Sequence, residues 1–201
     1  MADTEEGSVF DYERVIKAWD SAEVAIKQAE NVCLDVVIPA VAELRYAGRR
    51  FIEAQVLASN GDIKGASAKF EDAYFFCCRA QHDAVDAATA KITKDYSICV
   101  KGIGASEKAI AFPENNEFRD LLRKVQKLVV SSREDRDKRD QFYEMVRETD
   151  FPKILSLYDK FQDCQPGLEE LARKSRRAWL KPMLVTFTLT QIANTLWHVY
   201  G

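Results

Sequence analysis

The sequence predicts an all-α protein, an elongated antiparallel helical hairpin or bundle of about five to six helices that is coiled-coil-like and has a C-terminal apolar helix. Three observations predict this fold class. Apolar residues recur in steps of three and four over long stretches, and glycine and proline are few, at 8 and 5 of 201 residues. Alanine, glutamate, lysine, leucine and arginine are plentiful wherever that rhythm holds, which is typical of long helices.

The first predicted helix runs from Tyr12 to Ala58, after an acidic segment, residues 1–8, that we expect to be disordered. Ser8 is a suitable N-cap for it. The apolar rhythm continues through Pro39, so we expect a kinked continuous helix there, with a break at Pro39 as the alternative. Its average step of about 3.5 residues is that of a left-handed coiled coil. The apolar positions are Tyr12, Ile16, Trp19, Ala22, Ile26, Ala29, Cys33, Val37, Ala40, Leu44, Ala47, Phe51, Ala54 and Ala58.

A turn is predicted at Ser59-Asn60-Gly61-Asp62, because Gly61 suits the end of one helix and Asp62 can cap the start of the next. The second long helix should end near Gly102 and Gly104, so that residues 9–104 form a long helical hairpin. Small side chains dominate its apolar face, which lets two helices approach closely. The positions on this face are Ala66, Phe70, Ala73, Cys77, Ala80, Ala84 and Ala87, followed by Ile92 and Tyr96.

Part of this hairpin resembles one tetratricopeptide unit. The resemblance is carried by Leu44, Ala47, Gly48, Phe51, Gly61, Asp62, Ala66, Phe70 and Ala73. It covers about 30 residues, departs from the family by six extra residues before Gly61, and lacks the closing proline. Since no second copy follows in the sequence, the resemblance implies no stacked solenoid and no peptide-binding residues.

Residues 115–163 are predicted to form a charged helix followed by a short helix. The segment 133–140 is charged throughout with both signs interleaved, which favours a solvated face over a nucleic-acid patch. Pro152 suits the first turn of the short helix. Gln165-Pro166-Gly167 should then break the chain, so that residues 166–201 form a separate C-terminal helix, basic first and then apolar.

The C-terminal segment from Pro182 to Tyr200 contains no Asp, Glu, Lys or Arg. An uncharged run of this length behind basic residues raises the possibility of a membrane. One polar stripe is formed by Thr188, Gln191, Thr195 and His198. We therefore expect the helix to pack in a bundle or against a partner, with a membrane anchor or surface association as the alternative. The residues of this membrane or partner helix are Arg173, Lys174, Arg176, Arg177, Trp179, Trp197 and Tyr200.

Charge and cysteine usage narrow the classes of function. The net charge of −3, from 29 basic and 32 acidic residues, provides no global field for nucleic acid, so binding to nucleic acid is not expected. The 5 cysteines are odd in number and have no CxxC spacing, which favours a reducing compartment. The polar N-terminus lacks the pattern of a secretory signal, and we therefore expect a cytoplasmic protein.

No pattern in the sequence indicates catalysis, a cofactor or a metal. The two histidines, His82 and His198, are far apart in sequence and have neither HExxH nor ExxH spacing. A polar cluster can still be drawn, because residues of two predicted helices could meet across the hairpin around His82. Its members are Glu43, Arg50, Arg79, His82, Asp83 and Asp86. No nucleophile or oxyanion donor accompanies them, so we predict that the protein is not an enzyme and needs no cofactor.

The aromatic residues favour a protein partner. Phe51, Tyr74, Phe75 and Phe76 offer more aromatic surface than a two-helix seam requires, and the consecutive Tyr74, Phe75 and Phe76 must face several directions. We therefore expect a non-catalytic helical interaction or scaffold protein that self-associates or binds another protein. The alternative is a helical protein held at a membrane through residues 173–200 and facing the cytosol.

Overall fold

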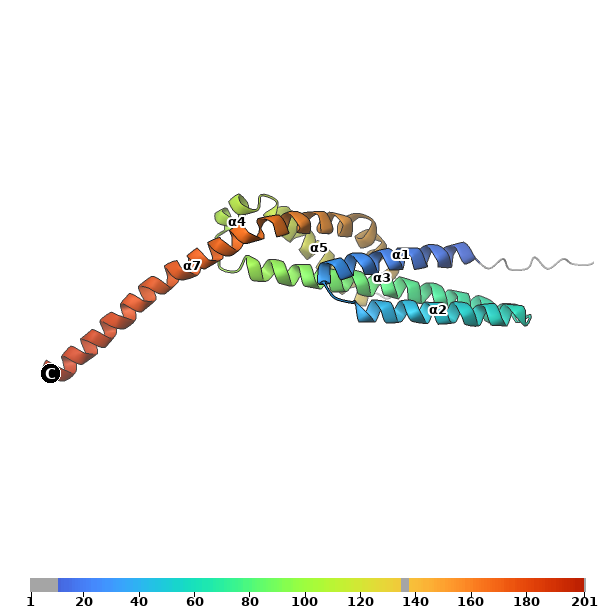
Figure 1. Ribbon diagram of the computed structural model, residues 1–201, viewed down its shortest axis with the longest axis horizontal. Coiled ribbons are helices and arrows are strands. Elements are labelled where there is room, and N and C mark those ends of the chain that lie inside the picture. The colour runs from blue at the N-terminus through green and yellow to red at the C-terminus, as the bar shows by residue number, and fades with distance from the viewer. Residues whose placement is uncertain (1–10, 135–137, 201) are drawn as a thin grey trace, which may run out of the picture. The chain divides into compact units, whose positions relative to one another are not determined.

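The computed structural model describes residues 11–134 and 138–200, and their side chains except at 133, 140, 177–190 and 192–200. These described residues are helical almost throughout, which confirms the all-α fold class (Figure 1). The elements in chain order are α1 (Tyr12–Cys33), α2 (Ile38–Ser59), α3 (Ile63–Cys99), α4 (Ala105–Ala111), α5 (Asn115–Glu134), α6 (Arg139–Met145), the π-helical turn η1 (Val146–Asp150) and α7 (Phe151–Tyr200).

The predicted continuous helix through Pro39 is wrong, and the alternative, a break, is found. Helix α1 ends at Cys33, and Leu34 adopts the left-handed conformation with φ 54°. Helix α2 then begins at Ile38 with Pro39 in its first turn. Proline is tolerated there because that N–H has no partner within the helix, and a proline also disfavours helical geometry in the residue before it. The described part of residues 9–104 therefore contains three helices, α1, α2 and α3, in place of the predicted two-helix hairpin.

Helices α1, α2 and α3 pack beside one another, and each runs antiparallel to the one before it (Figure 1). Their core is built in layers that take one or two residues from each helix. One layer joins Val15 of α1 to Ala54 of α2 and to Phe70 and Ala73 of α3. The next layer contains Ala18, Ala47 and Cys77. Small side chains at these positions allow the helix axes to approach closely, as the sequence predicts for the α2–α3 pair.

The turn between α2 and α3 lies where it is predicted. Gly61 has φ 83°, a conformation that residues with a Cβ atom rarely adopt. Asp62 then caps α3, because its carboxylate accepts a hydrogen bond from the Gly65 N–H at 2.9 Å. The N-cap of α1 is Asp11, whose side chain accepts from the Arg14 N–H, whereas the predicted cap Ser8 lies outside the described residues.

The described chain divides into two compact units. The first lies within Met1–Ile92 and Lys124–Phe151, and the second within Thr93–Arg123 and Pro152–Gly201. The core of the second unit is aromatic: the Phe112 and Phe118 ring centroids lie 5.8 Å apart, and those of Phe118 and Phe161 lie 5.9 Å apart. All three phenylalanine side chains are fully buried.

The predicted break at Gln165-Pro166-Gly167 is also wrong, because α7 continues through it from Phe151 to Tyr200. An interior proline removes one backbone hydrogen bond and costs about 3 kcal/mol. Buried side chains on both sides of Pro166 offset that cost, since each large aliphatic or phenylalanine side chain among them contributes about 1.5 to 3 kcal/mol when it is removed from water. They are Ile154, Leu157, Tyr158 and Phe161 before the proline and Leu168 and Ala172 after it.

Helix α5 begins at Asn115, as predicted for the start of the charged helix. Its buried apolar residues include Phe118, Leu122 and Val125. The predicted charged segment 133–140 lies partly outside the described residues. The chain after it forms α6 and η1, which were not predicted as separate elements, before α7 begins.

Candidate functional site

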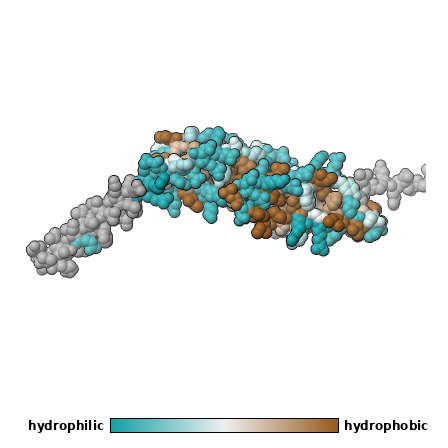
Figure 2. Space-filling model, viewed as in Figure 1, coloured by the Kyte–Doolittle hydropathy of each residue, from teal (hydrophilic) through white to brown (hydrophobic). Residues whose placement is uncertain are grey.

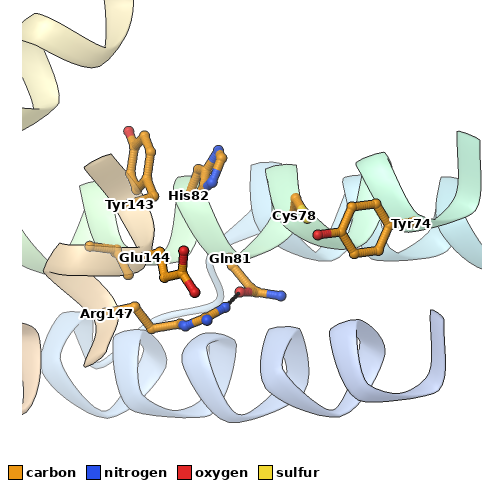
Figure 3. Close-up of a pocket in the computed structure, with 8 residues that line it drawn as sticks. Tyr74, Cys78, Gln81, His82, Tyr143, Glu144 and Arg147 are labelled. Carbon is orange, nitrogen blue, oxygen red and sulfur yellow. Dashed lines mark hydrogen bonds between the residues drawn. The ribbon is translucent and has the colours of Figure 1, made fainter. Parts of the chain in front are cut away.

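The polar cluster predicted around His82 is partly brought together in the first unit. His82 lies on α3 and is buried, with only 6% of its surface exposed. Its ring stacks on that of Tyr143 from α6, with centroids 3.7 Å apart and an interplanar angle of 17° (Figure 3). The Tyr143 hydroxyl donates a hydrogen bond to Asp86 Oδ1 at 2.8 Å, so a single tyrosine contacts two members of the predicted cluster.

Burial determines the protonation of these groups. The pKa of His82 falls to about 3, first because burial disfavours the imidazolium and then because Arg139, Arg147 and Arg79 add positive charge. Burial also raises the pKa of Tyr143, and the neighbouring Asp86 carboxylate adds to that shift. At neutral pH both side chains are therefore uncharged, and an imidazole with so low a pKa is a weak general base.

Glu43 of α2 and Arg79 of α3 also belong to the cluster. Burial raises the pKa of Glu43, Arg79 opposes the shift, and Asp83 reinforces it. The pKa of Asp83 is raised in turn by burial and by Asp86. Two carboxylates with raised pKa values thus share one arginine.

Arg50 does not join this cluster, which corrects the prediction. It lies seven residues after Glu43 on α2, and two helical turns separate them by about 10 Å. Its guanidinium instead contacts Glu53 at 2.6 Å and Asp72 at 3.8 Å. Lys69 contacts the same two carboxylates at 3.8 and 3.6 Å, and Arg49 contacts Glu53 at 3.0 Å, so these residues form a separate network of three cations and two anions.

A cavity of about 110 Å³ opens beside the His82–Tyr143 pair (Figure 3). Gln81 is one of its lining residues; its side-chain amide donates to the Ala18 carbonyl at 2.9 Å, and its side-chain oxygen accepts from Arg147. Arg147 belongs to the π-helical turn η1, a type of element that is frequent at functional sites. A second cleft of about 420 Å³ shares part of this lining and extends along α1. The first, smaller cavity is lined by Tyr74, Cys78, Gln81, His82, Val85, Tyr143, Glu144 and Arg147.

Described side chains in and around this cavity make contacts between helices. The neighbouring Cys77 thiol is in the core, and burial raises its pKa to about 12, which keeps it from forming the reactive thiolate. Within the side chains that the structure describes, no group of His, Cys, Asp and Glu has the geometry to hold a metal ion. The contacts from Tyr143 to Asp86 and from Arg147 to Gln81 instead connect α6 and η1 to α3.

Sequence reasoning did not identify Tyr143 and Arg147. They lie 61 and 66 residues after His82 and Gln81 respectively, and neither follows a local motif. The one local signal is that Tyr143 lies three residues before Val146, one of the apolar residues that follow the charged segment.

The four aromatic residues predicted as an interaction surface occupy different environments. Phe51 packs against Phe70 with centroids 5.4 Å apart, and it also contacts Tyr12. Tyr74 lies under the Arg14 guanidinium at 3.7 Å. Phe76 packs against Tyr46 at 5.8 Å. Phe75 is the exposed member, with 49% of its surface open to solvent.

A different set of exposed residues lies on α2. The residues Ile38, Val41, Arg45, Arg49, Ile52 and Val56 occur at helical spacing within an arc of about 80°, and all six are exposed. We call these six residues the α2 outer face. The residues that α2 buries, Ala40, Ala47 and Ala54, lie on the opposite side of the helix. Solvent-exposed hydrophobic surface is visible over α2 in Figure 2.

The basic residues of the C-terminal helix are exposed where the structure describes them. Arg173, Lys174 and Arg176 face solvent, and Lys174 pairs with Glu170 at 2.8 Å. The side chains of Arg177, Trp179, Trp197 and Tyr200 lie outside the described residues. Across the part of the chain that was searched for membrane spans, which is the described part, no helix is both long and apolar enough to cross a bilayer.

Comparison with known proteins adds no relative. No family model, no curated protein and no solved structure matches the chain. The local likeness of α2 and α3 to a tetratricopeptide unit therefore stays a resemblance.

Proposed function

We propose that this chain is a non-catalytic helical interaction protein that binds a protein partner through the α2 outer face. The observation that carries the proposal is the exposure of four branched apolar side chains on one side of one helix. Exposed fractions are 72% for Ile38, 42% for Val41, 65% for Ile52 and 54% for Val56. A helix that only covers a core usually presents polar residues to solvent, so this apolar side supports a second contact.

The other candidate surface offers less support for a function. The cavity beside His82 is small, and the polar groups around it bond to one another: Gln81 to Arg147 and Tyr143 to Asp86. These contacts connect helices without requiring a ligand. Binding at the α2 outer face, by contrast, would remove apolar surface from water, which stabilises a complex by about 25 cal/mol for each Å² that is buried.

Co-purification from the native host tests the proposal. Full-length tagged protein should retain a partner that Ile52→Glu loses, because docking would remove a charged side chain from water where wild type buries an apolar one. The matched control is Gln55→Glu, which adds the same charge to an exposed position of α2 beside the outer face. Circular dichroism should show equal helix content for all three proteins. Equal recovery of every co-purifying protein by wild type and Ile52→Glu would contradict the proposal.

A further inference from the structure

We infer that the partner at the α2 outer face is a helix with apolar side chains toward both ends of the contact and acidic side chains between them. The inference rests on the proposed function and specifies the chemistry of the partner. It follows from the order of residues along the face. Ile38 and Val41 come first, Arg45 and Arg49 lie in the middle, and the last two positions are Ile52 and Val56.

The length of the face suits a helix laid alongside it. From Ile38 to Val56 the face spans 18 residue steps, or about 27 Å at 1.5 Å per residue. A partner helix of about five turns would cover both apolar ends. Its middle turns would then meet the two arginines.

The central arginines keep positive charge available for a partner. In the described part of the chain Arg45 forms no ion pair, and its guanidinium lies 5.3 Å from the centroid of the Tyr46 ring. Arg49 contacts Glu53 at 3.0 Å, but Glu53 also serves Arg50 at 2.6 Å and Lys69 at 3.8 Å. Because several cations share this one carboxylate, a partner that supplies further carboxylates gains charge-assisted hydrogen bonds to arginine.

A second copy of this chain fits the face poorly. In an antiparallel pair of α2 helices, Ile38 would meet Val56 and Val41 would meet Ile52, but Arg45 would meet Arg49. In a parallel pair each arginine would meet itself. Either symmetric arrangement places like charges at the centre of the contact, where they oppose association.

A membrane surface also fits poorly. Helices that lie in a lipid interface carry their basic residues on the polar side, next to headgroups, with an uninterrupted apolar side in the lipid. Here Arg45 lies near the middle of the apolar arc, where it would be inserted most deeply.

Labelled synthetic peptides test the inference on the full-length protein. Three helical peptides of equal length would carry leucines spaced to meet the two apolar ends, and their middle turn would carry two glutamates, two glutamines or two lysines. Fluorescence anisotropy would measure binding at about 0.15 M salt, where the Debye length is about 8 Å. We expect the glutamate peptide to bind at least tenfold more tightly than the lysine peptide, with glutamine between them.

Variants then locate the effect. Arg45→Glu/Arg49→Glu should reverse the order of the glutamate and lysine peptides, and Ile52→Glu should weaken all three. Equal binding of the glutamate and lysine peptides, or no binding of any peptide, would overturn the inference. If Ile52→Glu still loses its co-purifying partner in that case, the proposed function stands without the acidic partner.

Two further measurements test whether a second copy of the chain or a membrane occupies the α2 outer face instead. Sedimentation of wild type that shows a dimer absent from Ile52→Glu would overturn the inference in favour of a second copy. Binding to vesicles of anionic phospholipid that Ile52→Glu abolishes would overturn it in favour of a membrane. A wild-type monomer and equal vesicle binding by both proteins are the expected results.

Discussion

Burial against the Tyr143 ring keeps the His82 imidazole neutral, and this makes the side chain a source of acid sensitivity. The pKa of His82 is about 3 in the folded chain, against 6.5 for an ordinary histidine. Between these values the unfolded chain binds a proton that the folded chain does not. Stability is therefore fully present above about pH 6.5 and decreases as pH falls toward 3.

His82→Phe should remove this contribution while keeping an aromatic ring against Tyr143. Between pH 6 and 4, each tenfold rise in proton concentration should lower the unfolding free energy of wild type by up to about 1.4 kcal/mol more than that of the variant. Urea denaturation at several pH values measures the difference. The pKa values of Glu43 and Asp83 are raised in the folded chain, so their contribution to stability increases as the pH falls, opposite to that of His82. The prediction therefore concerns the difference between wild type and variant, and not the pH dependence of wild type alone. A difference between wild type and variant that does not change with pH would contradict the prediction.

Tyr143→Phe isolates the hydrogen bond to Asp86. The ring stack on His82 remains while the donor to Asp86 Oδ1 is lost, so we expect a loss of about 1 to 3 kcal/mol in unfolding free energy. Tyr143→Ala removes both contacts and should cost about 3 to 5 kcal/mol. Urea denaturation at pH 8, where His82 is neutral in both states, measures both variants. Equal losses would show that the hydrogen bond, and not the ring, accounts for the stability.

How far single residues can be predicted from the sequence depends on whether their partners are local. The sequence placed His82 and Asp86 on one polar face because they lie four residues apart on a helix. Tyr143, 61 residues after His82, was not found, because its one local signal, the spacing to Val146, does not specify a ring stack on His82. Arg50 was wrongly assigned to the cluster because the sequence does not show which carboxylate an arginine will contact. In the structure it pairs with Glu53 and Asp72 and not with the residues around His82.

Two prolines show why helix boundaries were harder to predict than helices. The apolar rhythm led to a continuous helix through Pro39, where the chain breaks, and Pro166-Gly167 led to a break where α7 continues. Pro39 follows three β-branched residues, Val36, Val37 and Ile38, of which Val37 alone is buried, so little packing opposes the break. Pro166 lies between Phe161 and Leu168, both fully buried, and their packing overrides the local preference.

A matched pair of glycine substitutions tests this account of the elements. Gly167→Ala should raise the unfolding free energy by about 0.5 to 1 kcal/mol, because residue 167 is in the interior of α7 and nothing lies within 4 Å of an added Cβ. Gly61→Ala meets the same open space, but φ there is +83°, so it should destabilise the protein by about 1 kcal/mol or more. Thermal denaturation monitored by circular dichroism compares the two. A loss of stability in Gly167→Ala would contradict a continuous α7.

At the scale of the molecule, the two units differ in how their cores are built. The first unit packs α1, α2 and α3 through alanines such as Ala47 and Ala54, with Phe70 among its large buried side chains. The second unit is held by Phe112, Phe118 and Phe161. The all-α class followed from periodicity and composition, whereas the division into units did not, because α3 and α5 each contribute residues to both.

Hydrogen exchange should reveal the two cores as separate centres of stability. Phe161→Ala removes a fully buried ring from the second unit and should cost about 3 to 5 kcal/mol there, which corresponds to faster exchange by a factor on the order of a hundred or more. Mass spectrometry of peptides covering 154–168 should show this acceleration, while peptides covering 66–84 change much less. Phe70→Ala should give the reverse pattern. Equal acceleration in both segments for both variants would mean that the chain opens as one cooperative unit, since long shared helices can transmit unfolding from one core to the other.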